Sequence, residues 1–132
     1  MEIREYTDYK AAEIFNLYSN VGWTAYTDDP EALKAGFHNS LLTLAAYDGD
    51  KLVGIIRAVG DGATIVYIQD ILVFPEYQRK GIGSALIQAL LERFKTVRQI
   101  VLATDNTPKT ISFYKSQGFV QMAEIGCCGF MK

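Results

Sequence analysis

The stretch "TIVYIQDILVFPEYQRKGIGSALIQALLERF", residues 64–94, constrains the fold more than any other part of the chain. Residues 64–74 are rich in apolar and β-branched side chains, which predicts a long buried strand. From Ile82 onward, apolar residues recur three and four positions apart, which predicts an amphipathic helix from Gly81 to Phe94. A strand joined to a helix by a short loop favours the α/β class, so we expect helices packed against a central sheet.

The rest of the chain supplies further strands and helices around this unit. Neither an internal repeat nor a linker divides the sequence, so we expect a single domain over residues 1–132. Hydrophobic patterning predicts strands over 2–6, 41–47, 51–60, 64–74 and 99–104, helices over 9–19, 30–40, 81–94 and 108–117, and one or two terminal strands after them.

Composition excludes several classes of partner. The 132 residues carry a formal net charge of -2, and the sequence pI is about 5.3, whereas nucleic-acid-binding domains are normally basic. The longest apolar runs, such as 71–74, are far too short to cross a bilayer. No basic segment leads into an apolar one at the N-terminus, so we expect a soluble, cytoplasmic protein.

The sequence offers little for a metal ion. Cys127 and Cys128 are adjacent and cannot easily bridge each other, and His38, which is the one histidine, lies far away along the chain. Because protein metal sites need several ligands at suitable spacing, we expect no metal and reduced thiols in the core or in an interface.

The loop before the predicted helix has the composition of an anion site. Backbone N–H groups at a helix N-terminus lack intrahelical partners, and the helix dipole favours negative charge there. Gly81 and Gly83 let a bulky anion approach the backbone, while Arg79 and Lys80 add positive charge. A plain flexible loop is the alternative. The spacing fits neither a P-loop nor a dinucleotide fingerprint, because Leu86 stands where the latter needs a small residue.

The pattern Q-x-x-G-x-G, formed by Gln78, Gly81 and Gly83, follows a strand that ends in "ILVF". Together with "YIQDILVF", "QIVLAT" and "FYKSQGF" in that order, it resembles the GNAT superfamily of acetyl-CoA-dependent N-acetyltransferases over essentially the whole chain. The resemblance implies a mixed, mostly antiparallel sheet of about six or seven strands flanked by about four helices. It also implies that the fourth and fifth strands splay apart to form a cofactor slot.

The same resemblance implies which residues would hold acetyl-CoA. Backbone groups of the strand end would line the pantetheine arm, and backbone N–H groups of the loop would hold the pyrophosphate. Tyr114 would be the general acid toward the departing thiolate and would also contact the cofactor, and Asn106 would contact the cofactor arm. The strand residues are Ile71, Leu72 and Val73; the loop residues are Gln78, Arg79, Lys80, Gly81, Ile82, Gly83 and Ser84.

The general base is left open by the sequence. Strict alternation would put Tyr67, Gln69 and Ile71 on one face of the strand and Asp70 on the other. As the strand's one carboxylate, Asp70 could be a base if a bulge turned it, or a hydrogen-bonded structural group. A water chain held by Tyr67 and Gln69, which would face the acceptor, is the preferred alternative.

The acceptor is expected to be a small amine. Trp23 and Tyr26 stand beside an acidic run, 28–31, and aromatic faces near carboxylates suit an ammonium group on an apolar body. Alternatively, Trp23 fills the core and the acidic run caps the next helix. The stretches 22–40 and 51–62 look similar to the plant and cyanobacterial aralkylamine branch, and 68–83 to glucosamine-phosphate acetyltransferases.

An arylalkylamine-like acceptor therefore ranks first, with an amino sugar, a polyamine or a protein amine behind it. A rival class is a non-catalytic module that binds CoA. The terminal segment "IGCCGFMK" could offer an open strand edge, so a homodimer is a candidate assembly.

Overall fold

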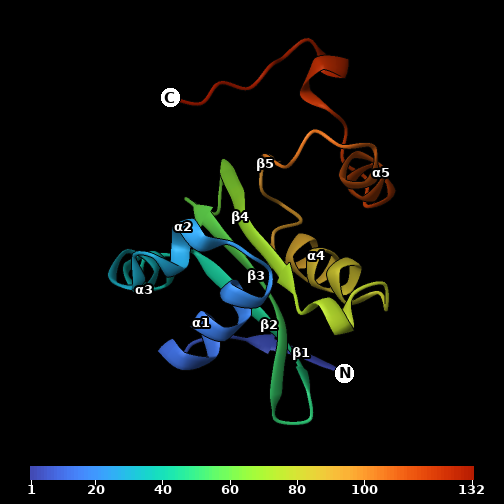
Figure 1. Cartoon of the computed structure of the whole chain (residues 1–132). Coiled ribbons are helices and arrows are strands. Elements are labelled where there is room, and N and C mark those ends of the chain that lie inside the picture. Colours follow the sequence, from blue (N-terminus) through green and yellow to red (C-terminus); the bar gives the residue numbers. More distant parts are fainter. The chain divides into compact units, whose positions relative to one another are not determined.

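The computed structural model describes all of residues 1–132 as a strand-rich first part followed by a short helical second part (Figure 1). The strands are β1 (Glu2–Glu5), β2 (Leu42–Asp48), β3 (Lys51–Gly60), β4 (Ile65–Val73) and β5 (Gln99–Leu102). The α-helices are α1 (Ala11–Asn20), α2 (Thr24–Thr27), α3 (Pro30–His38), α4 (Ile82–Arg93) and α5 (Pro108–Ser116), and the 3₁₀ helices are η1 (Pro75–Tyr77) and η2 (Met122–Ile125). The chain divides into two compact units, Met1–Val101 and Leu102–Lys132.

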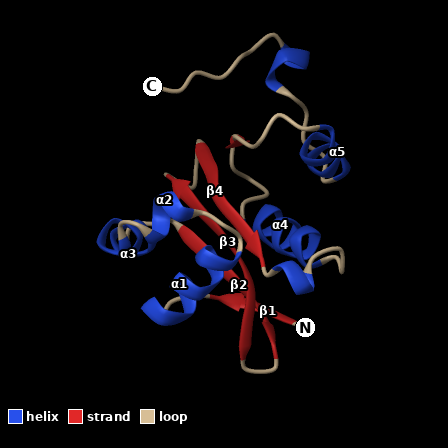
Figure 2. Ribbon diagram, in the orientation of Figure 1, coloured by secondary structure: helices blue, strands red, loops and turns tan.

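The first unit is built on a twisted sheet with helices on both faces (Figure 2). The strand order is β1-β2-β3-β4-β5, and β1 to β4 pair antiparallel in sequence order. Ala45, Ile55 and Leu72 are cross-strand partners and pack with α1 and α3 in one core cluster. Gly54, next to Ile55 and therefore on the opposite face, lies against Leu86 of α4. The predicted α/β fold is confirmed.

The strand count is lower than expected. The sheet has five strands rather than six or seven, and no strand follows α5. Residues 119–132 form only the one-turn helix η2, which ends at Gly126 with a left-handed φ of 79°. Glycines weaken strands because they add backbone freedom and no packing surface, and Gly129 follows shortly after. The prediction of one or two terminal strands is therefore wrong.

The second unit is described by itself. Helix α5 begins after Thr107, whose side chain accepts a hydrogen bond from the Thr110 N–H at 3.3 Å. The C-terminal segment of the second unit carries large exposed apolar side chains, with Phe130 95% exposed. Cys127 and Cys128 are free and exposed, so the expectation that they lie in the core is wrong, whereas their place in an interface stays a prediction. A single domain over 1–132 stays a prediction.

A β-bulge at Gln69 changes the facing of side chains along β4. Asp70 pairs with Arg57, but the next pair joins Ile68 to Ala58, so Gln69 is an extra residue without a partner on β3. Since Arg57 and Ala58 are neighbours and point to opposite faces, Asp70 and Ile68 also point to opposite faces. The expectation that side chains alternate strictly between the two faces of β4 is therefore wrong. Because of the bulge, Asp70 lies on the same face as Tyr67, which is the partner of Val59.

No helix is both long and apolar enough to span a membrane. No group of three or more histidine, cysteine, aspartate or glutamate side chains is placed to hold a metal ion.

Candidate functional site

The loop between β4 and α4 has an unusual backbone. Arg79 has a φ of 62°, the one positive value at a residue other than glycine, and Gly81 has a φ of 82°. A non-glycine side chain in the left-handed region costs free energy, so such a conformation is retained where the surrounding structure demands it. A Cβ built on Gly81 would meet no atom within 4 Å, so the space beside this residue is open.

The start of α4 leaves backbone donors available. Gly81 is the N-cap residue and makes no side-chain cap, and the first intrahelical bond runs from the Ala85 N–H to the Gly81 carbonyl at 3.0 Å. The N–H groups of Ile82 and Gly83, at the first two positions of α4, precede this first intrahelical bond and lie at the helix N-terminus. The first turn carries no acidic side chain that would repel an anion.

Two hydrogen bonds fix the loop to the sheet. The side-chain amide of Gln78 donates to the carbonyl of Val73 at 3.0 Å, which ties the loop back to the end of β4. The hydroxyl of Tyr77 donates to Asp48, at the end of β2, at 2.7 Å. The ammonium of Lys80 lies 5.4 Å from the centre of the Tyr77 ring, and Arg79 and Lys80 are both exposed. Positive charge therefore lines an anchored loop.

The backbone of β4 offers further donors and acceptors. The Phe74 N–H donates to Val53 of β3 at 2.9 Å, so even-numbered residues at this end of β4 turn their backbone groups toward β3. Those of Ile71 and Val73 consequently point away from β3, toward the side on which β5 follows in the strand order. Of the three residues predicted to line the pantetheine arm, Ile71 and Val73 have backbone groups that point away from β3, whereas the backbone groups of Leu72 point toward β3.

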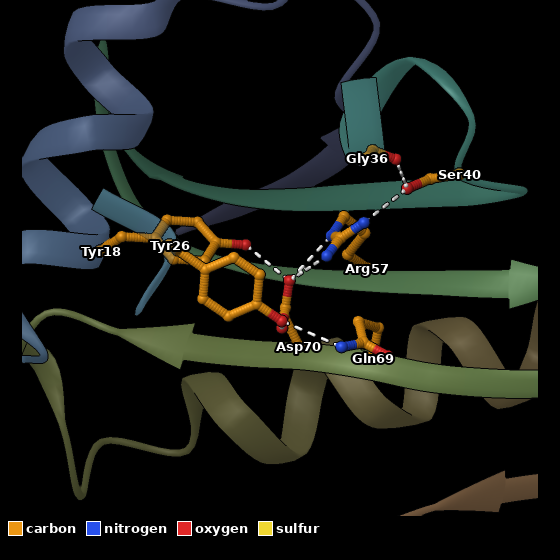
Figure 3. Close-up of polar contacts among 7 residues, drawn as sticks. All are labelled: Tyr18, Tyr26, Gly36, Ser40, Arg57, Gln69 and Asp70. Atoms are coloured by element: carbon orange, nitrogen blue, oxygen red, sulfur yellow. Dashed lines mark hydrogen bonds and ion pairs between the residues drawn. The ribbon is translucent and has the colours of Figure 1, made fainter. Parts of the chain in front are cut away.

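Asp70 lies at the centre of a buried polar network (Figure 3). Its Oδ2 accepts from the Tyr18 hydroxyl at 2.8 Å and from Arg57, whose Nε is at 2.8 Å and Nη2 at 2.7 Å. Its Oδ1 accepts from the Tyr26 hydroxyl at 2.8 Å. Asp70 is 1% exposed and Arg57 5% exposed. The geometry favours the structural alternative for Asp70, because its carboxylate is already paired on both oxygens.

The network continues beyond the ion pair. Nη1 of Arg57 donates to Ser40 Oγ at 3.2 Å, and that hydroxyl donates to the Gly36 carbonyl at 2.7 Å (Figure 3). No buried side-chain nitrogen or oxygen lacks a hydrogen-bond partner. Because an unpaired buried charge is costly, this complete pairing is what permits the ion pair inside the sheet.

The buried groups have shifted acidities. Burial raises the pKa of Tyr18 far above its usual value, and the neighbouring Asp70 carboxylate adds to the rise. Burial also raises the pKa of Tyr26, while the hydrogen bond from Gln69 lowers it. For Arg57, burial lowers the pKa but the attraction of Asp70 outweighs it, so the net pKa is raised. At neutral pH the phenols are therefore neutral and the guanidinium is charged.

Three of the four residues predicted to bind the acceptor are in contact. The rings of Trp23 and Tyr26 stack with centroids 5.9 Å apart, and the side-chain amide of Gln69 donates to the Tyr26 hydroxyl at 2.9 Å. Trp23 is 36% exposed, so it does not fill the core. Tyr67 is half-buried and lies on the same face of β4 as Asp70.

The acidic run next to these aromatics has a structural part. Asp29 is the N-cap of α3, and its carboxylate accepts from the Ala32 N–H at 3.2 Å. The alternative that this run caps the next helix is confirmed for Asp29. Asp28 and Glu31 are exposed.

Comparison with known proteins fits this arrangement. The model of the acetyltransferase (GNAT) family matches residues 9–119. The chain belongs to this family. The predicted resemblance to GNAT proteins is thereby confirmed, and so is the prediction of an acetyltransferase class.

Individual relatives agree with the assignment. A GNAT-family acetyltransferase protein from Streptococcus pneumoniae TIGR4 is 40% identical, with a TM-score of 0.91, and the match covers 99% of this chain and 96% of that one. An uncharacterized N-acetyltransferase, ycf52-like, from Prochlorococcus marinus is 32% identical over 89% of this chain and 67% of its own length. An aminoglycoside 6'-N-acetyltransferase complexed with coenzyme A shares the fold, with 20% identity, a TM-score of 0.72, and coverage of 89% of this chain and 84% of that one.

The GNAT chain is shorter than its curated relatives. It spans about two thirds of the Prochlorococcus protein, 64% of the Pyropia yezoensis one and 60% of the Gracilaria one.

Two predicted GNAT site residues lie in the second unit. Tyr114 packs edge-on against Phe113 and Phe119, with ring centroids 5.1 and 6.0 Å away. Burial raises the pKa of Tyr114, and a hydrogen bond with Thr104 lowers it. Asn106 is exposed in the loop before α5. Their roles stay predictions.

Sequence reasoning missed three members of the buried network, Tyr18, Ser40 and Arg57. Arg57 carried a usable signal: it interrupts the apolar strand "KLVGIIRAVG", and a charge inside a buried strand needs a counter-charge. Asp70, in the apolar run that follows, was the obvious partner. Tyr18 lies within the helix predicted over 9–19, but nothing in the pattern of that helix reveals where its hydroxyl points.

Proposed function

We propose that this chain is an N-acetyltransferase that moves the acetyl group of acetyl-CoA to the primary amine of a small molecule. Both substrates bind together, and the amine attacks directly. The observation that carries the proposal is the loop at 78–84: an anchored, positively charged turn with left-handed Arg79 and Gly81 that leads into the N-terminus of α4, where the N–H groups of Ile82 and Gly83 precede the first intrahelical bond. A helix N-terminus of this kind favours a phosphate group.

The residues present fit acetyl-CoA. The loop supplies N–H donors and two cationic side chains for the pyrophosphate, and the backbone groups of Ile71 and the N–H of Val73 point outward for the pantetheine arm. The aminoglycoside acetyltransferase that shares the fold was crystallised with coenzyme A, which supports the same cofactor here. When bound, acetyl-CoA supplies an activated acetyl thioester.

The acceptor side supports an amine on an aromatic or apolar body. The Trp23 and Tyr26 rings present a stacked, partly exposed surface next to the polar end of Gln69. Aromatic faces attract cations and also cover apolar groups. We therefore place an arylalkylamine-like acceptor first, ahead of amino sugars, polyamines and protein amines.

The amine must lose a proton to become nucleophilic. Because both oxygens of Asp70 are paired, we assign this proton to a water chain held by Tyr67 and Gln69 rather than to the Asp70 carboxylate. Tyr114 is the candidate donor to the departing thiolate. Its burial-raised pKa keeps it protonated at neutral pH, as a hydrogen-bond donor must be.

The decisive experiment measures free thiol and acetylated product together. The purified chain is incubated with acetyl-CoA and, separately, phenethylamine, tryptamine, glucosamine 6-phosphate, spermidine and a lysine-containing peptide. We expect thiol release that depends on one of the arylalkylamines, with a matching mass increase of that amine. Binding of acetyl-CoA without thiol release from any amine would instead identify a non-catalytic CoA-binding module.

A further inference from the structure

The Tyr26 hydroxyl connects the buried Asp70 of the Arg57–Asp70 pair to the side chain of Gln69 (Figure 3). Tyr26 is half-buried and its oxygen lies 2.8 Å from Asp70 Oδ1, whereas Asp70 itself is 1% exposed. Gln69, the bulged residue, is exposed and lies on the other side of the same hydroxyl at 2.9 Å. Tyr26 thus connects the buried charge to an exposed aromatic surface.

The direction of each hydrogen bond follows from the groups involved. The Asp70 carboxylate pairs with the Arg57 guanidinium, and an ionised carboxylate can only accept hydrogen bonds. The Tyr26 hydroxyl must therefore donate its proton to Asp70. The amide nitrogen of Gln69 can only donate, so the phenol oxygen accepts from it. With its proton engaged, Tyr26 can offer an approaching ligand only an acceptor.

This acceptor lies close to the expected position of the thioester. If the pyrophosphate binds at 79–84, a cofactor arm that runs back along β4 passes Val73 and then Ile71 before it reaches Gln69. The four steps of the strand from Val73 to Gln69 span about 13 Å at the usual rise per residue. The Tyr26 hydroxyl, in contact with the Gln69 and Asp70 side chains, is therefore at the far end of that path.

We propose that Asp70 and Arg57 are positioning residues of the acceptor site: by holding the Tyr26 hydroxyl proton, the buried pair turns the phenol oxygen into an acceptor for an N–H of the substrate amine. The inference rests on the proposed function and deepens it. It gives Asp70 a role other than a base, because the carboxylate fixes the direction of the Tyr26 hydrogen bond and leaves the phenol oxygen to accept from the amine.

A purely structural network would behave differently. Tyr18 and Tyr26 each donate one phenol hydrogen bond of 2.8 Å to the same carboxylate, Tyr18 to Oδ2 and Tyr26 to Oδ1. Tyr18 is completely buried, so its hydroxyl cannot meet a ligand. If the network only held helices to the sheet, Tyr18→Phe and Tyr26→Phe would have similar effects on ligand binding. Tyr18→Phe is therefore the matched control.

The test measures amine binding without turnover. Trp23 is the single tryptophan of the chain and stacks on Tyr26, so its emission reports on this surface. Phenethylamine is titrated into the protein with saturating CoA, under selective tryptophan excitation. We expect a saturable change in the parent, about tenfold weaker binding in Tyr26→Phe, the size of one hydrogen bond to a charged group, and binding within about twofold of the parent in Tyr18→Phe.

Asp70→Asn tests the positioning role directly. An asparagine amide can donate to Tyr26 and release its proton toward the ligand, so we expect the same loss of affinity as in Tyr26→Phe. Parent-like affinity in a folded Asp70→Asn would overturn the role of Asp70. Because this variant leaves the Arg57 charge unpaired and can unfold, the two tyrosine variants decide the proposal by themselves.

The outcomes separate this inference from the proposed function. Equal loss in both tyrosine variants, unchanged affinity in Tyr26→Phe, or no saturable change in the parent would overturn the inference, even if thiol is released with some amine. Absence of thiol release, with phenethylamine and CoA both bound, would overturn the proposed function and leave the binding result standing.

Discussion

Arg57 and Asp70 face each other across the β3–β4 pair with their charged atoms 2.7 Å apart and almost no side-chain exposure, 6% and 0%. The pair fits only because its surroundings are shaped for it. A Cβ on Gly36 would come within 3.0 Å of Arg57 Nη1, so a larger residue at that position would displace the guanidinium. The ion pair therefore links β3, β4 and the end of α3.

Removing one charge should destabilise the fold strongly. Arg57→Met leaves the Asp70 carboxylate buried without its counter-charge, and we expect a loss of about 3–5 kcal/mol in the free energy of unfolding. Urea denaturation at pH 7 measures it. The control is the double variant Arg57→Met with Asp70→Leu, which removes both charges and should recover most of the loss. A single-variant loss below about 1 kcal/mol would contradict a tightly buried pair.

Stability should fall at alkaline pH, in part through Tyr18. Its folded-state pKa is raised by burial, whereas an unfolded tyrosine has a pKa of about 10. The unfolded chain thus loses this proton first, so the contribution is complete below pH about 10 and declines above it by about 1.4 kcal/mol per pH unit. The urea midpoint should therefore fall less between pH 8 and pH 11 in Tyr18→Phe than in the parent. Equal declines would show that Tyr18 does not titrate abnormally.

The sequence predicted the strands and helices that have a long hydrophobic period. It did not predict the features that depend on single residues. Strand 64–74 and helix 81–94 were found within a residue because long apolar patterns specify them. The bulge at Gln69 could not be seen in the hydrophobic pattern. β4 has buried side chains on both of its faces, so buried and more exposed residues still alternate along it despite the bulge. The short helix α2 was not predicted, since its four residues are too few to show a period. The loop residues were predictable from glycine and charge, whereas the phenol contacts of Asp70 depend on distant packing.

A negative charge at the start of α4 should block cofactor binding. Acetyl-CoA at about a hundredfold excess over its dissociation constant should stabilise the parent by about 2.7 kcal/mol, seen as a higher melting temperature. Gly83→Glu should abolish that rise, because a carboxylate would stand where the pyrophosphate is expected. The matched control is Ala85→Glu, which adds the same charge at an exposed position of the same helix. A full thermal shift in a folded Gly83→Glu would disprove the phosphate assignment.

The hydrogen bond from Tyr77 to Asp48 should preorganise the cofactor loop. Tyr77→Phe frees the loop at one of its two attachments, and we expect the dissociation constant of CoA to rise about two- to tenfold, as for one exposed hydrogen bond. Calorimetry measures this constant for Tyr77→Phe, for Asp48→Ala and for the double variant. The double variant should lose no more affinity than either single one, since all three break one contact. If the loss of affinity in the double variant equals the sum of the two single losses, the two side chains act separately.

The last prediction concerns Tyr114. As the proposed donor to the departing thiolate, its hydroxyl should matter for turnover and not for cofactor affinity. Transfer of a proton from a phenol of pKa about 10 to a thiolate of pKa about 8.5 is unfavourable by about 2 kcal/mol, and burial raises the pKa of Tyr114 further. A charge-assisted hydrogen bond to the developing thiolate, with proton transfer completed late or from water, is therefore its main contribution.

Tyr114→Phe should lower kcat by about tenfold to a few hundredfold, the lower part of the range for general-acid assistance, because a water can replace the missing hydroxyl. Turnover is measured against pH with saturating acetyl-CoA, alongside the calorimetric affinity for CoA. Phe113→Leu is the control for packing, since Phe113 touches the same ring and carries no hydroxyl. If kcat of Tyr114→Phe stays within about twofold of the parent across the pH range, Tyr114 is a packing residue, and the thiolate leaves with assistance from water alone.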